Sequence, residues 1–374
     1  MKSKPAMINF FFKSTGINLS LFIRYFGLML ILTGLAGNAA GQNEESEYKI
    51  TILPVPSIGY SPETKTYLGA VSLFTIKNTS DTLTRTSNAK IEFNYTWNKQ
   101  IIAEAGWNYF FPEEKWFTRG ILHYSKYPDL YYGIGFNTPV AAEIKFQSNR
   151  FIFEVDMLRQ IQKNRFFGFG ITYKSYGNIE NQTINISYPE LKNESNLGLE
   201  ALLLTDSRNN ILTPSDGIYF EFSNSFNFGS SFYYKTSLDY RRYFGWGNSD
   251  KNVLAGRVYH SGIIGNPPFY DFNMIGGDKF ARGYYLGRFR DKNFSTLQLE
   301  YRSPLLWRFG LATFGGLSMI VDTFQNINNE SFKPNAGVGL RFLTDKNEGT
   351  NLRIDYAVGA HNQSGFYISF GESF

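Results

Sequence analysis

The residues of this chain best suited to chemistry lie together in a stretch rich in glycine and arginine. Residues 276–291 read Gly-Gly-Asp-Lys-Phe-Ala-Arg-Gly-Tyr-Tyr-Leu-Gly-Arg-Phe-Arg-Asp. An arginine such as Arg282 can donate two parallel hydrogen bonds to a carboxylate or a phosphate. A long connection without regular structure is uncommon unless it has a function. We therefore predict a functional motif formed by Gly276, Gly277, Arg282, Gly283 and Tyr284.

The sequence lacks the motifs that are typical of enzymes. It has no Gly-x-Ser-x-Gly nucleophile elbow, no phosphate-binding loop and no metal motif that contains histidine. The absence of cysteine excludes disulfides and thiolate metal sites. The three histidines, His123, His260 and His361, are widely separated along the chain. We predict no enzymatic activity, no catalytic residue, no metal site and no cofactor.

Residues 1–41 have the features of a secretory signal. They carry four basic residues and no acidic residue, and an apolar run of 12 residues extends from Tyr25 to Ala36. Small residues follow at Ala39-Ala40-Gly41. This order is typical of a signal peptide, so we predict cleavage before Gln42. The alternative is an uncleaved anchor, although a membrane-spanning helix needs roughly 20 apolar residues.

The rest of the chain, residues 42–374, is nearly neutral and unusually aromatic. Removing the four basic residues of the signal leaves 33 Lys+Arg against 32 Asp+Glu. This balance gives no support to a nucleic-acid partner or to a general trap for anions. Phe (36) and Tyr (25) exceed their ordinary usage, while charged residues make up only 18% of the chain. A mean hydropathy of -0.27 excludes a bundle of transmembrane helices.

Apolar and polar residues alternate over nearly all of the chain after the signal. The alternation is clear in residues 89–97, 218–223, 232–241 and 352–358. Successive side chains of a strand point to opposite faces, so each segment is a strand with one apolar face and one polar face. We predict 16 strands at 49–60, 65–76, 87–97, 100–110, 117–126, 144–158, 165–177, 194–205, 217–228, 231–244, 253–263, 294–303, 309–321, 335–344, 350–359 and 365–374.

The lengths of the predicted connections distinguish a membrane barrel from a soluble sandwich. If the first strand begins at the periplasmic side, the longest connections, 127–143, 178–193, 264–293 and 322–334, all lie on the extracellular side. Outer-membrane barrels have long extracellular loops and short periplasmic turns. A closed barrel also leaves no backbone donor unpaired in lipid. We therefore predict an all-β fold, an antiparallel transmembrane β-barrel of about 16 strands in the outer membrane of a Gram-negative bacterium.

A second motif lies near the middle of the predicted barrel. Asp206 and Arg208 are followed by Pro214 and Gly217. Asp206 can accept hydrogen bonds from backbone N–H groups and from Arg208, while Pro214 fixes its own φ. Together with residues 276–291, this Asp-x-Arg…Pro-x-x-Gly turn resembles the BamA/TamA outer-membrane superfamily, also called the bacterial surface antigen family. The alternative for the turn alone is an ordinary polar connection.

The resemblance implies that the loop around Arg282 folds back into the barrel and that Arg282 pairs with Asp355. The charged residues that strand parity points into the lumen are Glu300, Arg341, Arg353 and Asp355. A charge-assisted pair would tether the loop there. Ala281 stands where the family has a larger aliphatic residue, and we expect slightly looser packing at the loop tip. The alternative is that these charges only solvate a pore.

The two ends of the barrel carry further predictions. Phe366, Ile368, Phe370 and Phe374 are predicted to lie on the lipid-facing side of the last strand. The resemblance implies that such a strand is the signal that barrel-assembly machinery recognises, although any lipid-facing last strand is apolar. In the first strand, Pro54 and Pro56 lack N–H groups toward the same neighbour. Prolines within sheets occur at edges or weak seams.

We predict that both prolines face the last strand and leave a poorly bonded closure that can open sideways. The alternative is that both lie outside the membrane-embedded part and only blunt the start of the strand. The best-known members of the family carry POTRA modules that dock client proteins. Only residues 42–48 precede the first predicted strand, so we expect no such module in this chain.

The predicted function is to assist the insertion or translocation of proteins at the outer membrane. The expected partners are outer-membrane lipid and other outer-membrane proteins or assembly machinery, without nucleic acid. One alternative is a narrow or plugged transport channel, whose conductance would rise when Arg282 is removed. Another is a structural barrel whose external loops dock a surface partner.

Overall fold

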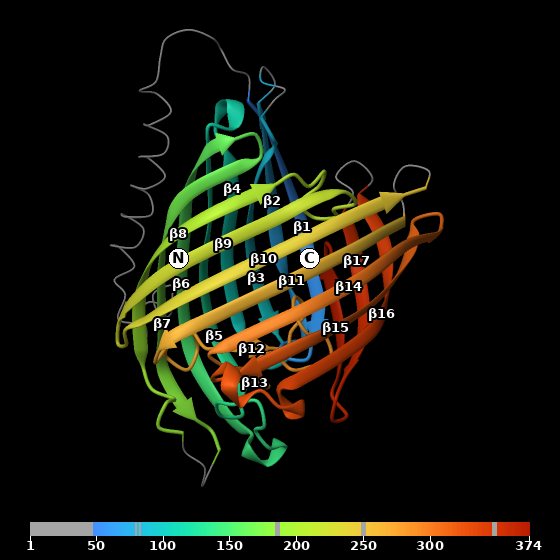
Figure 1. Cartoon of the computed structure of the whole chain (residues 1–374). Helices are drawn as coiled ribbons and strands as arrows, with labels where there is room; N and C mark the ends of the chain where they lie inside the picture. The colour runs from blue at the N-terminus through green and yellow to red at the C-terminus, as the bar shows by residue number, and fades with distance from the viewer. Residues whose placement is uncertain (1–47, 79–80, 82–83, 184–187, 248–251, 346–349) are drawn as a thin grey trace, which may run out of the picture. The chain divides into compact units, whose positions relative to one another are not determined.

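The computed structural model describes residues 48–78, 81, 84–183, 188–247, 252–345 and 350–374. The predicted signal peptide, residues 1–41, lies outside the described residues. In the described part, 16 antiparallel strands close into a barrel, so the predicted fold class is confirmed (Figure 1). Every wall strand pairs with its neighbours in sequence order, except that β11 is followed in the wall by β14. None of the described helices is long and apolar enough to span a membrane.

The wall strands agree closely with the alternation in the sequence. They are β1 (Tyr48–Ser61), β2 (Lys65–Asn78), β3 (Ser87–Thr96), β4 (Ile101–Phe110), β5 (Trp116–Tyr131), β6 (Ile144–Gln162), β7 (Arg165–Asn181), β8 (Glu194–Asp206), β9 (Gly217–Gly229), β10 (Tyr233–Trp246), β11 (Asn252–Gly265), β14 (Asn293–Leu306), β15 (Phe309–Val321), β16 (Phe332–Asp345), β17 (Thr350–Gly359) and β18 (Ser364–Phe370). In β3, Ile91 and Phe93 are exposed by 56% and 53%, whereas Asn94 and Thr96 are buried. Apolar side chains therefore point outward to lipid and polar ones inward.

The connections contain short elements that the alternation did not predict. β12 (Asn273–Ile275) and β13 (Phe289–Asp291) pair with each other inside the long connection between β11 and β14. β5 continues to Tyr131, beyond its predicted end at residue 126, and pairs with β6 over this extension. The short helical turns are η1 (Pro112–Glu114), η2 (Val140–Ala142), η3 (Phe324–Asn326) and η4 (Asn329–Ser331).

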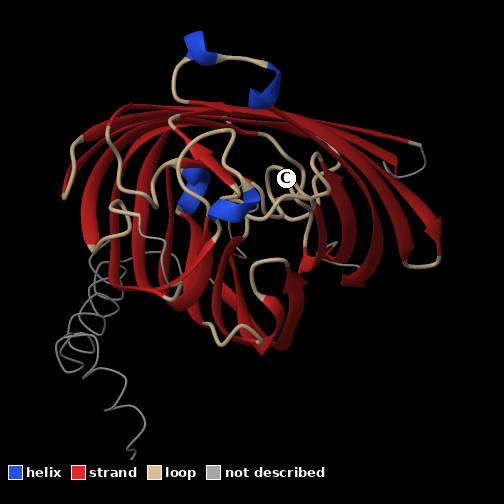
Figure 2. Ribbon diagram, turned by 90° about the horizontal axis from the view of Figure 1, so that it is seen from below, coloured by secondary structure: helices blue, strands red, loops and turns tan. Residues whose placement is uncertain are grey.

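Loops and short helical turns lie across the interior of the barrel, as the view along it shows (Figure 2). The long connection between β11 and β14 contributes Ile275, Ala281, Tyr284 and Phe289 to an apolar cluster with wall residues. Ala281 is fully buried in this cluster. A second cluster joins this connection to the β5–β6 region, and its buried members are Tyr131, Ile144, Phe146, Phe269 and Tyr270.

The end of the chain departs from its predicted position. β18 ends at Phe370, and Gly371 has a φ of 78°, which turns the backbone away from the strand. Phe374 is only 4% exposed and packs against Tyr243 and Ala255 inside the barrel. The prediction that Phe374 faces lipid on the last strand is therefore wrong. Phe366 and Phe370 do lie on the outside, exposed by 40% and 47%, and Ile368, between them, is partly exposed.

Candidate functional site

The connection between β11 and β14 lies in the lumen as a compact loop, which we call the lumen loop (residues 266–292). Its two sides are held together by backbone hydrogen bonds, from Gly277 N to Tyr284 O (3.1 Å) and from Gly287 N to Ile275 O (2.9 Å). Gly283 has a φ of 107°, and a Cβ there would come within 2.8 Å of the Val358 carbonyl carbon. Glycine at this position therefore allows the loop backbone to lie directly against β17.

Arg282 reaches from the lumen loop to two carboxylates on separate wall strands. Its Nη1 lies 2.5 Å from Asp355 Oδ2 on β17, and its Nη2 lies 2.5 Å from Glu300 Oε2 on β14. The guanidinium group also lies over the ring of Phe314, 3.3 Å from its centroid. Arg282 is 1% exposed, and both carboxylate residues are fully buried. The pairs are thus charge-assisted and shielded from water, where such contacts are strongest.

Three further arginines from the wall surround the same carboxylates. Arg302 Nε lies 2.7 Å from Glu300 Oε1, and Arg341 Nη1 lies 2.6 Å from Asp355 Oδ1. Arg353 Nη1 lies 3.2 Å from Asp355 Oδ2. We call these six residues the lumen cluster: Arg282, Glu300, Arg302, Arg341, Arg353 and Asp355. Buried charges are tolerated only when they are paired and hydrogen-bonded, and here each carboxylate has at least three cationic neighbours.

Two tyrosines fasten the loop around Arg282, and sequence reasoning identified only one of them. The predicted residue Tyr284 donates from its hydroxyl to Pro334 O (2.8 Å) and accepts from Ala360 N (2.7 Å). Gly283 N donates to the hydroxyl of Tyr367 on β18 (3.0 Å). Tyr367 was missed, although its position between Phe366 and Ile368 gives it the inward parity of the last strand. The lumen loop is therefore bonded to β16, to β18 and to the end of β17.

Two acidic residues outside the predicted set also join the lumen cluster. Arg353 Nη2 lies 2.9 Å from Asp278 Oδ2 in the lumen loop. Arg341 Nε lies 2.8 Å from Glu372 Oε2, beyond the end of β18. Strand parity could not predict either residue, because both lie outside the wall strands.

The predicted mid-barrel turn meets the lumen cluster through the backbone. Asp206 accepts from Arg208 Nε (2.9 Å) and Nη2 (2.8 Å), which closes the turn after β8. Pro214 O accepts from Arg302 Nη1 (3.1 Å). Gly217 has a φ of 108°, and a Cβ there would lie 2.4 Å from Ser207 O. The two motifs that carried the family resemblance are thus linked through Arg302 and Glu300 on β14.

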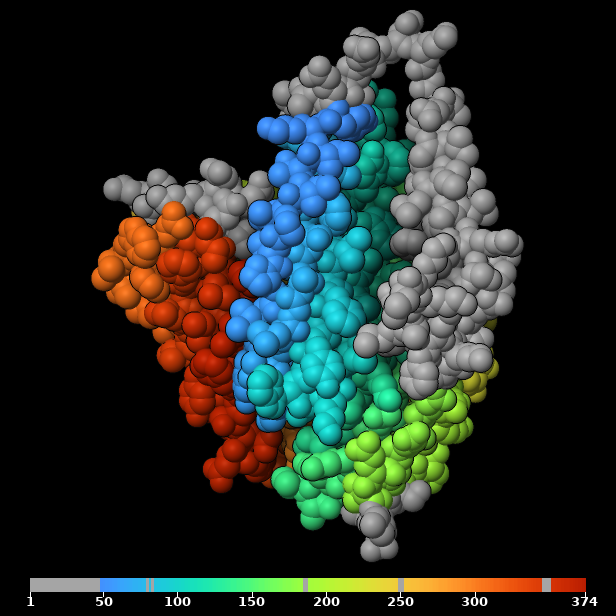
Figure 3. All heavy atoms as spheres, turned by 180° about the vertical axis from the view of Figure 1, so that it is seen from behind, coloured from blue at the N-terminus to red at the C-terminus, as the bar shows by residue number. Residues whose placement is uncertain are grey.

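The junction between the first and last wall strands is the least paired line of the barrel. Tyr60 and Ile368 form its one register pair among the described residues, whereas β1 pairs with β2 along its full length. Pro54 lies opposite Ser72 and Pro56 opposite Ala70, both on β2. Figure 3 shows β1 beside the C-terminal strands on this side of the barrel. We call the β1–β18 junction the seam.

Two other sets of polar contacts lie outside the lumen cluster. His123 Nδ1 lies 3.1 Å from Glu104 Oε2, and its Nε2 lies 3.1 Å from Ser125 Oγ. This order of groups is that of a hydrolytic triad, but Ser125 is fully buried in the wall, out of reach of a substrate. At the predicted periplasmic end, the Arg85 side chain donates two hydrogen bonds to Glu114 (2.9 and 3.0 Å), and the Arg85 backbone N–H donates a third (2.8 Å).

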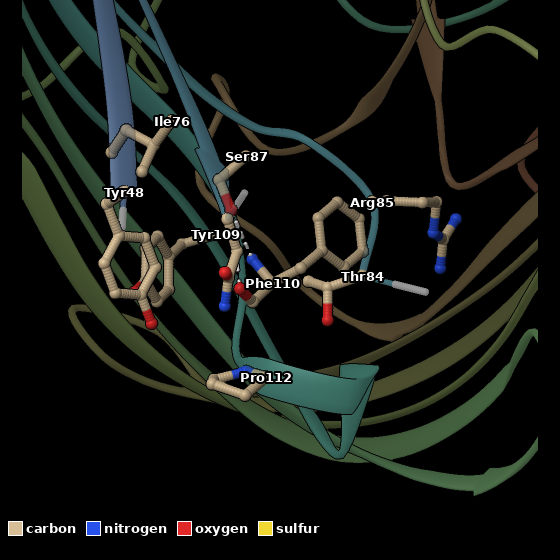
Figure 4. A pocket seen from close by; sticks show the side chains of 9 residues that line it. Tyr48, Ile76, Thr84, Arg85, Ser87, Tyr109, Phe110 and Pro112 are labelled. Carbon is tan, nitrogen blue, oxygen red and sulfur yellow. Dashed lines mark hydrogen bonds between the residues drawn. The ribbon is translucent and has the colours of Figure 1, made fainter. Parts of the chain in front are cut away.

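Figure 4 shows the small pocket around Arg85. The Arg85 guanidinium lies 4.4 Å from the centroid of the Phe110 ring, and Phe110 N donates to Ser87 Oγ (2.8 Å). Its lining residues are Tyr48, Ile76, Asn78, Thr84, Arg85, Ser87, Tyr109, Phe110 and Pro112. Arg85 stacks on the Phe110 ring and pairs with Glu114, and these contacts stabilise this rim of the barrel.

Asp291 gives the lumen loop a pH dependence that can be measured. Burial, reinforced by the nearby charge of Asp322, raises the pKa of Asp291 to about 6. An aspartate in an unfolded chain titrates near 4. Between about pH 4 and 6 the folded state therefore binds more protons than the unfolded state, and stability falls as the pH rises. We expect Asp291→Asn to be more stable than the parent at pH 7, by on the order of 1–3 kcal/mol.

Urea unfolding of the barrel in detergent at pH 4 and pH 7 measures this difference. Glu113→Gln is the matched control, because the Glu113 side chain is 63% exposed. An Asp291→Asn variant with the same pH dependence as the parent would rule out this assignment.

Comparisons with known proteins agree with the geometry. The model of the Omp85 superfamily domain matches residues 87–374. BamA from Haemophilus ducreyi lacking POTRA domains 1–3 has a similar fold, with a TM-score of 0.57 at 13% identity over 88% of this chain and 71% of that one.

CdiB from Acinetobacter baumannii and CdiB from Escherichia coli have TM-scores of 0.53 and 0.52 at 12% and 10% identity. These likenesses cover 86% and 88% of this chain, which spans 65% and 63% of the two CdiB chains. A search of curated proteins finds no significant match. Because the family model matches most of a chain that forms the corresponding barrel, the chain belongs to the Omp85 superfamily and is an integral β-barrel protein of the outer membrane.

Proposed function

We propose that this barrel helps other proteins to enter or cross the outer membrane, and that it does so at the seam. The observation that carries this proposal is the single register pair, Tyr60 with Ile368, that joins β1 to β18. β18 has 7 residues and β1 has 14, so most of the β1 edge has no partner on this side. An unpaired strand edge presents N–H and C=O groups that can pair with a strand from another chain.

The prolines of β1 support the same proposal. Pro54, Pro56 and Tyr60 have the same parity, so their backbone nitrogens are oriented toward the same neighbour. In the register set by Tyr60 and Ile368, Phe370 lies opposite Ile58, so Pro54 and Pro56 lie on the part of the β1 edge beyond the end of β18, where they leave two positions without a donor. A strand that enters the seam replaces few existing hydrogen bonds, so opening costs less here than at any fully paired junction.

Locking the seam tests the proposal. Cysteines at Tyr60 and Ile368 would join β1 to β18 by a disulfide, since paired positions on neighbouring strands have suitable separations. Photocrosslinking probes along β1 and β18 in living cells would report contacts with unfinished outer-membrane proteins. We expect such crosslinks in the reduced protein and their loss after oxidation. The matched control places cysteines at Leu352 and Phe370, across the fully paired β17–β18 junction.

Loss of crosslinks only in the seam pair would support the proposal. Crosslinks that persist with the seam locked, or that never form at any probe position, would reject it. The second outcome favours the barrel that docks a surface partner, and probes in the β5–β6 and β7–β8 connections would then find that partner.

Restoring the missing donors tests whether an entering strand pairs with the free edge of β1. We expect Pro54→Val together with Pro56→Val to increase client crosslinks by several-fold, because each restored N–H can donate to the entering strand and contribute about 0.5–1.5 kcal/mol to its binding. Pro128→Val in β5 restores a donor far from the seam and is the control. Unchanged crosslinking in the double variant would show that an entering strand does not pair with this part of β1.

A further inference from the structure

We infer that the periplasmic rim of the barrel binds anionic phospholipid headgroups at three arginine–aromatic pairs on its outer face. The pairs are Arg159 with Trp116, Arg242 with Phe244, and Arg308 with Trp307. All three lie toward the end of the barrel with the short connections, which is the periplasmic end of an outer-membrane barrel. The inference goes beyond the proposed function and does not depend on it, because lipid can bind to this rim whether or not the seam opens.

Strand parity places two of these arginines on the lipid-facing side of the wall. Arg159 lies between Met157 and Ile161 in the alternation of β6, and both of these neighbours are exposed. Arg242 has the same parity in β10 as Phe244, which is also exposed. Arg159 lies three residues, and Arg242 four residues, before the end of its strand. A charge on the lipid face is costly in the middle of the bilayer but is tolerated near the interface, where headgroups lie.

The third pair lies in the turn between β14 and β15. Trp307 is 77% exposed, and the centre of its ring lies 6.1 Å from that of Phe309 and 6.0 Å from that of Phe342. The Arg308 guanidinium lies 5.6 Å from the centroid of the Trp307 ring, and its Nε has no hydrogen-bond partner among the described residues. An arginine beside exposed aromatic rings suits the headgroup region, where the rings meet acyl chains and the charge meets phosphate.

The three outward arginines differ from arginines of the lumen in their partners. Arg119 and Arg241 point inward, and their nitrogens lie 2.7 and 2.6 Å from carboxylate oxygens. By contrast, Arg159, Arg242 and Arg308 form no ion pair within the described residues and lie against aromatic rings instead. A guanidinium group can donate two parallel hydrogen bonds to one phosphate, so a lipid phosphate supplies the partner that the chain does not.

The headgroup that suits these arginines carries a net negative charge. Phosphatidylethanolamine has an ammonium group of its own that competes for its phosphate, whereas phosphatidylglycerol has no cation. Each lysine or arginine near an anionic membrane surface strengthens binding by about fivefold. The lipid class is therefore an anionic phospholipid such as phosphatidylglycerol.

The distribution of the pairs favours a lipid leaflet over a periplasmic protein. Along the wall, β7, β8 and β9 separate the first pair from the second, and β11 separates the second from the third. A protein partner would contact one patch of this rim, whereas a leaflet meets all of it at one depth. Aromatic residues line outer-membrane barrels at the membrane interfaces, which places these rings beside the headgroups.

Native mass spectrometry of the barrel in detergent tests the inference. The protein is incubated with equal amounts of phosphatidylglycerol and phosphatidylethanolamine, and the retained lipids are counted. We expect phosphatidylglycerol to be retained at least about fivefold more than phosphatidylethanolamine. A variant that combines Arg159→Gln, Arg242→Gln and Arg308→Gln should lose this preference. Heat-dependent mobility checks that the variant is folded, as we expect for outward side chains without ion pairs.

A single substitution at the same rim provides the matched control. Lys115 is already paired with Glu113 at 3.0 Å, so Lys115→Gln should leave lipid retention unchanged, whereas Arg308→Gln should reduce the retained phosphatidylglycerol. Equal losses in these two variants would show that retention follows net charge alone and would overturn the inference.

Two further results would also overturn it. One is equal retention of the two lipids by the parent protein, and the other is an unchanged preference in the folded triple variant. If the triple variant does not fold, the three single variants are measured in the same way, and an unchanged preference in all of them rejects the inference. A periplasmic protein captured by a photocrosslinker at Trp307, without any lipid preference, would identify the turn as a docking surface for protein instead.

Discussion

Replacing Arg282 with methionine is expected to lower the free energy of unfolding of the barrel by about 3–5 kcal/mol. The substitution keeps an unbranched side chain of similar length but removes one cation from between Glu300 and Asp355, each of which lies 2.5 Å from it. Both carboxylates are fully buried, so water cannot replace the lost partner without opening the lumen loop. Urea unfolding in detergent, followed by tryptophan fluorescence, measures the change.

Arg288→Met is the matched control for this prediction. Arg288 lies in the same loop and is 5% exposed, but its hydrogen bonds go to the hydroxyl and carbonyl oxygens of Thr138. Removing it leaves neutral acceptors behind, and we expect a loss of about 1–3 kcal/mol. Equal losses in the two variants would show that the lumen cluster contributes no more than ordinary hydrogen bonds.

The Arg282 variant also distinguishes the remaining functions. Single-channel recording in planar bilayers would show a raised, steady conductance if the loop plugs a transport channel. If conductance stays low while client crosslinks at the seam decrease, the loop supports assembly instead. A partial recovery of stability in the double variant Arg282→Met with Glu300→Gln would identify the unpaired carboxylate as the cause of the loss.

Introducing alanine at Gly276 should displace the lumen loop, with a loss of roughly 2–5 kcal/mol from backbone strain and overpacking together. Gly276 has a φ of 113°, and a Cβ there would lie 2.1 Å from the carbonyl oxygen of Tyr285. This oxygen belongs to the backbone on the opposite side of the loop, so no side-chain rotation can relieve the clash. Limited proteolysis of the folded barrel should then cut between β12 and β13, where we expect the parent to remain intact.

Gly135→Ala separates the two contributions to that loss. Gly135 has a φ of 126°, but a Cβ there would have no atom within 4 Å. Strain without a clash should cost about 1–3 kcal/mol and leave the lumen loop resistant to protease. If both variants resist proteolysis equally, close contact at Gly276 does not hold the loop in place.

The barrel could be predicted from sequence because lipid imposes one rule on every wall strand. Ile91 and Phe93 point outward and Asn94 and Thr96 inward, as the period of two requires. The same rule gave the inward direction of Glu300 and Asp355. The family resemblance then supplied what parity cannot, namely that Arg282 comes from a loop far along the chain to lie between them.

The parts that sequence could not predict follow no such period. β12 and β13 have three residues each, too few for alternation to be recognised. Phe374 was assigned to the lipid face because the apolar pattern of β18 was extended past Gly371, whose positive φ redirects the chain. Glu104, His123 and Ser125 are joined by hydrogen bonds across β4 and β5. This contact could not be predicted without the register of the two strands, which places Glu104 opposite His123.

The reach of Arg282 from β14 to β17 has a mechanical consequence. β15 and β16 lie between these strands, so one side chain braces an arc of the wall from the inside, and Arg341 on β16 shares the same two carboxylates. A barrel wall that is stiff along one arc does not bend evenly under lateral pressure. Bending is expected to concentrate where the wall has the fewest strand-to-strand contacts. That place is the seam, which has one register pair. We therefore expect lateral pressure from the bilayer to bend the wall most at the seam, between β1 and β18.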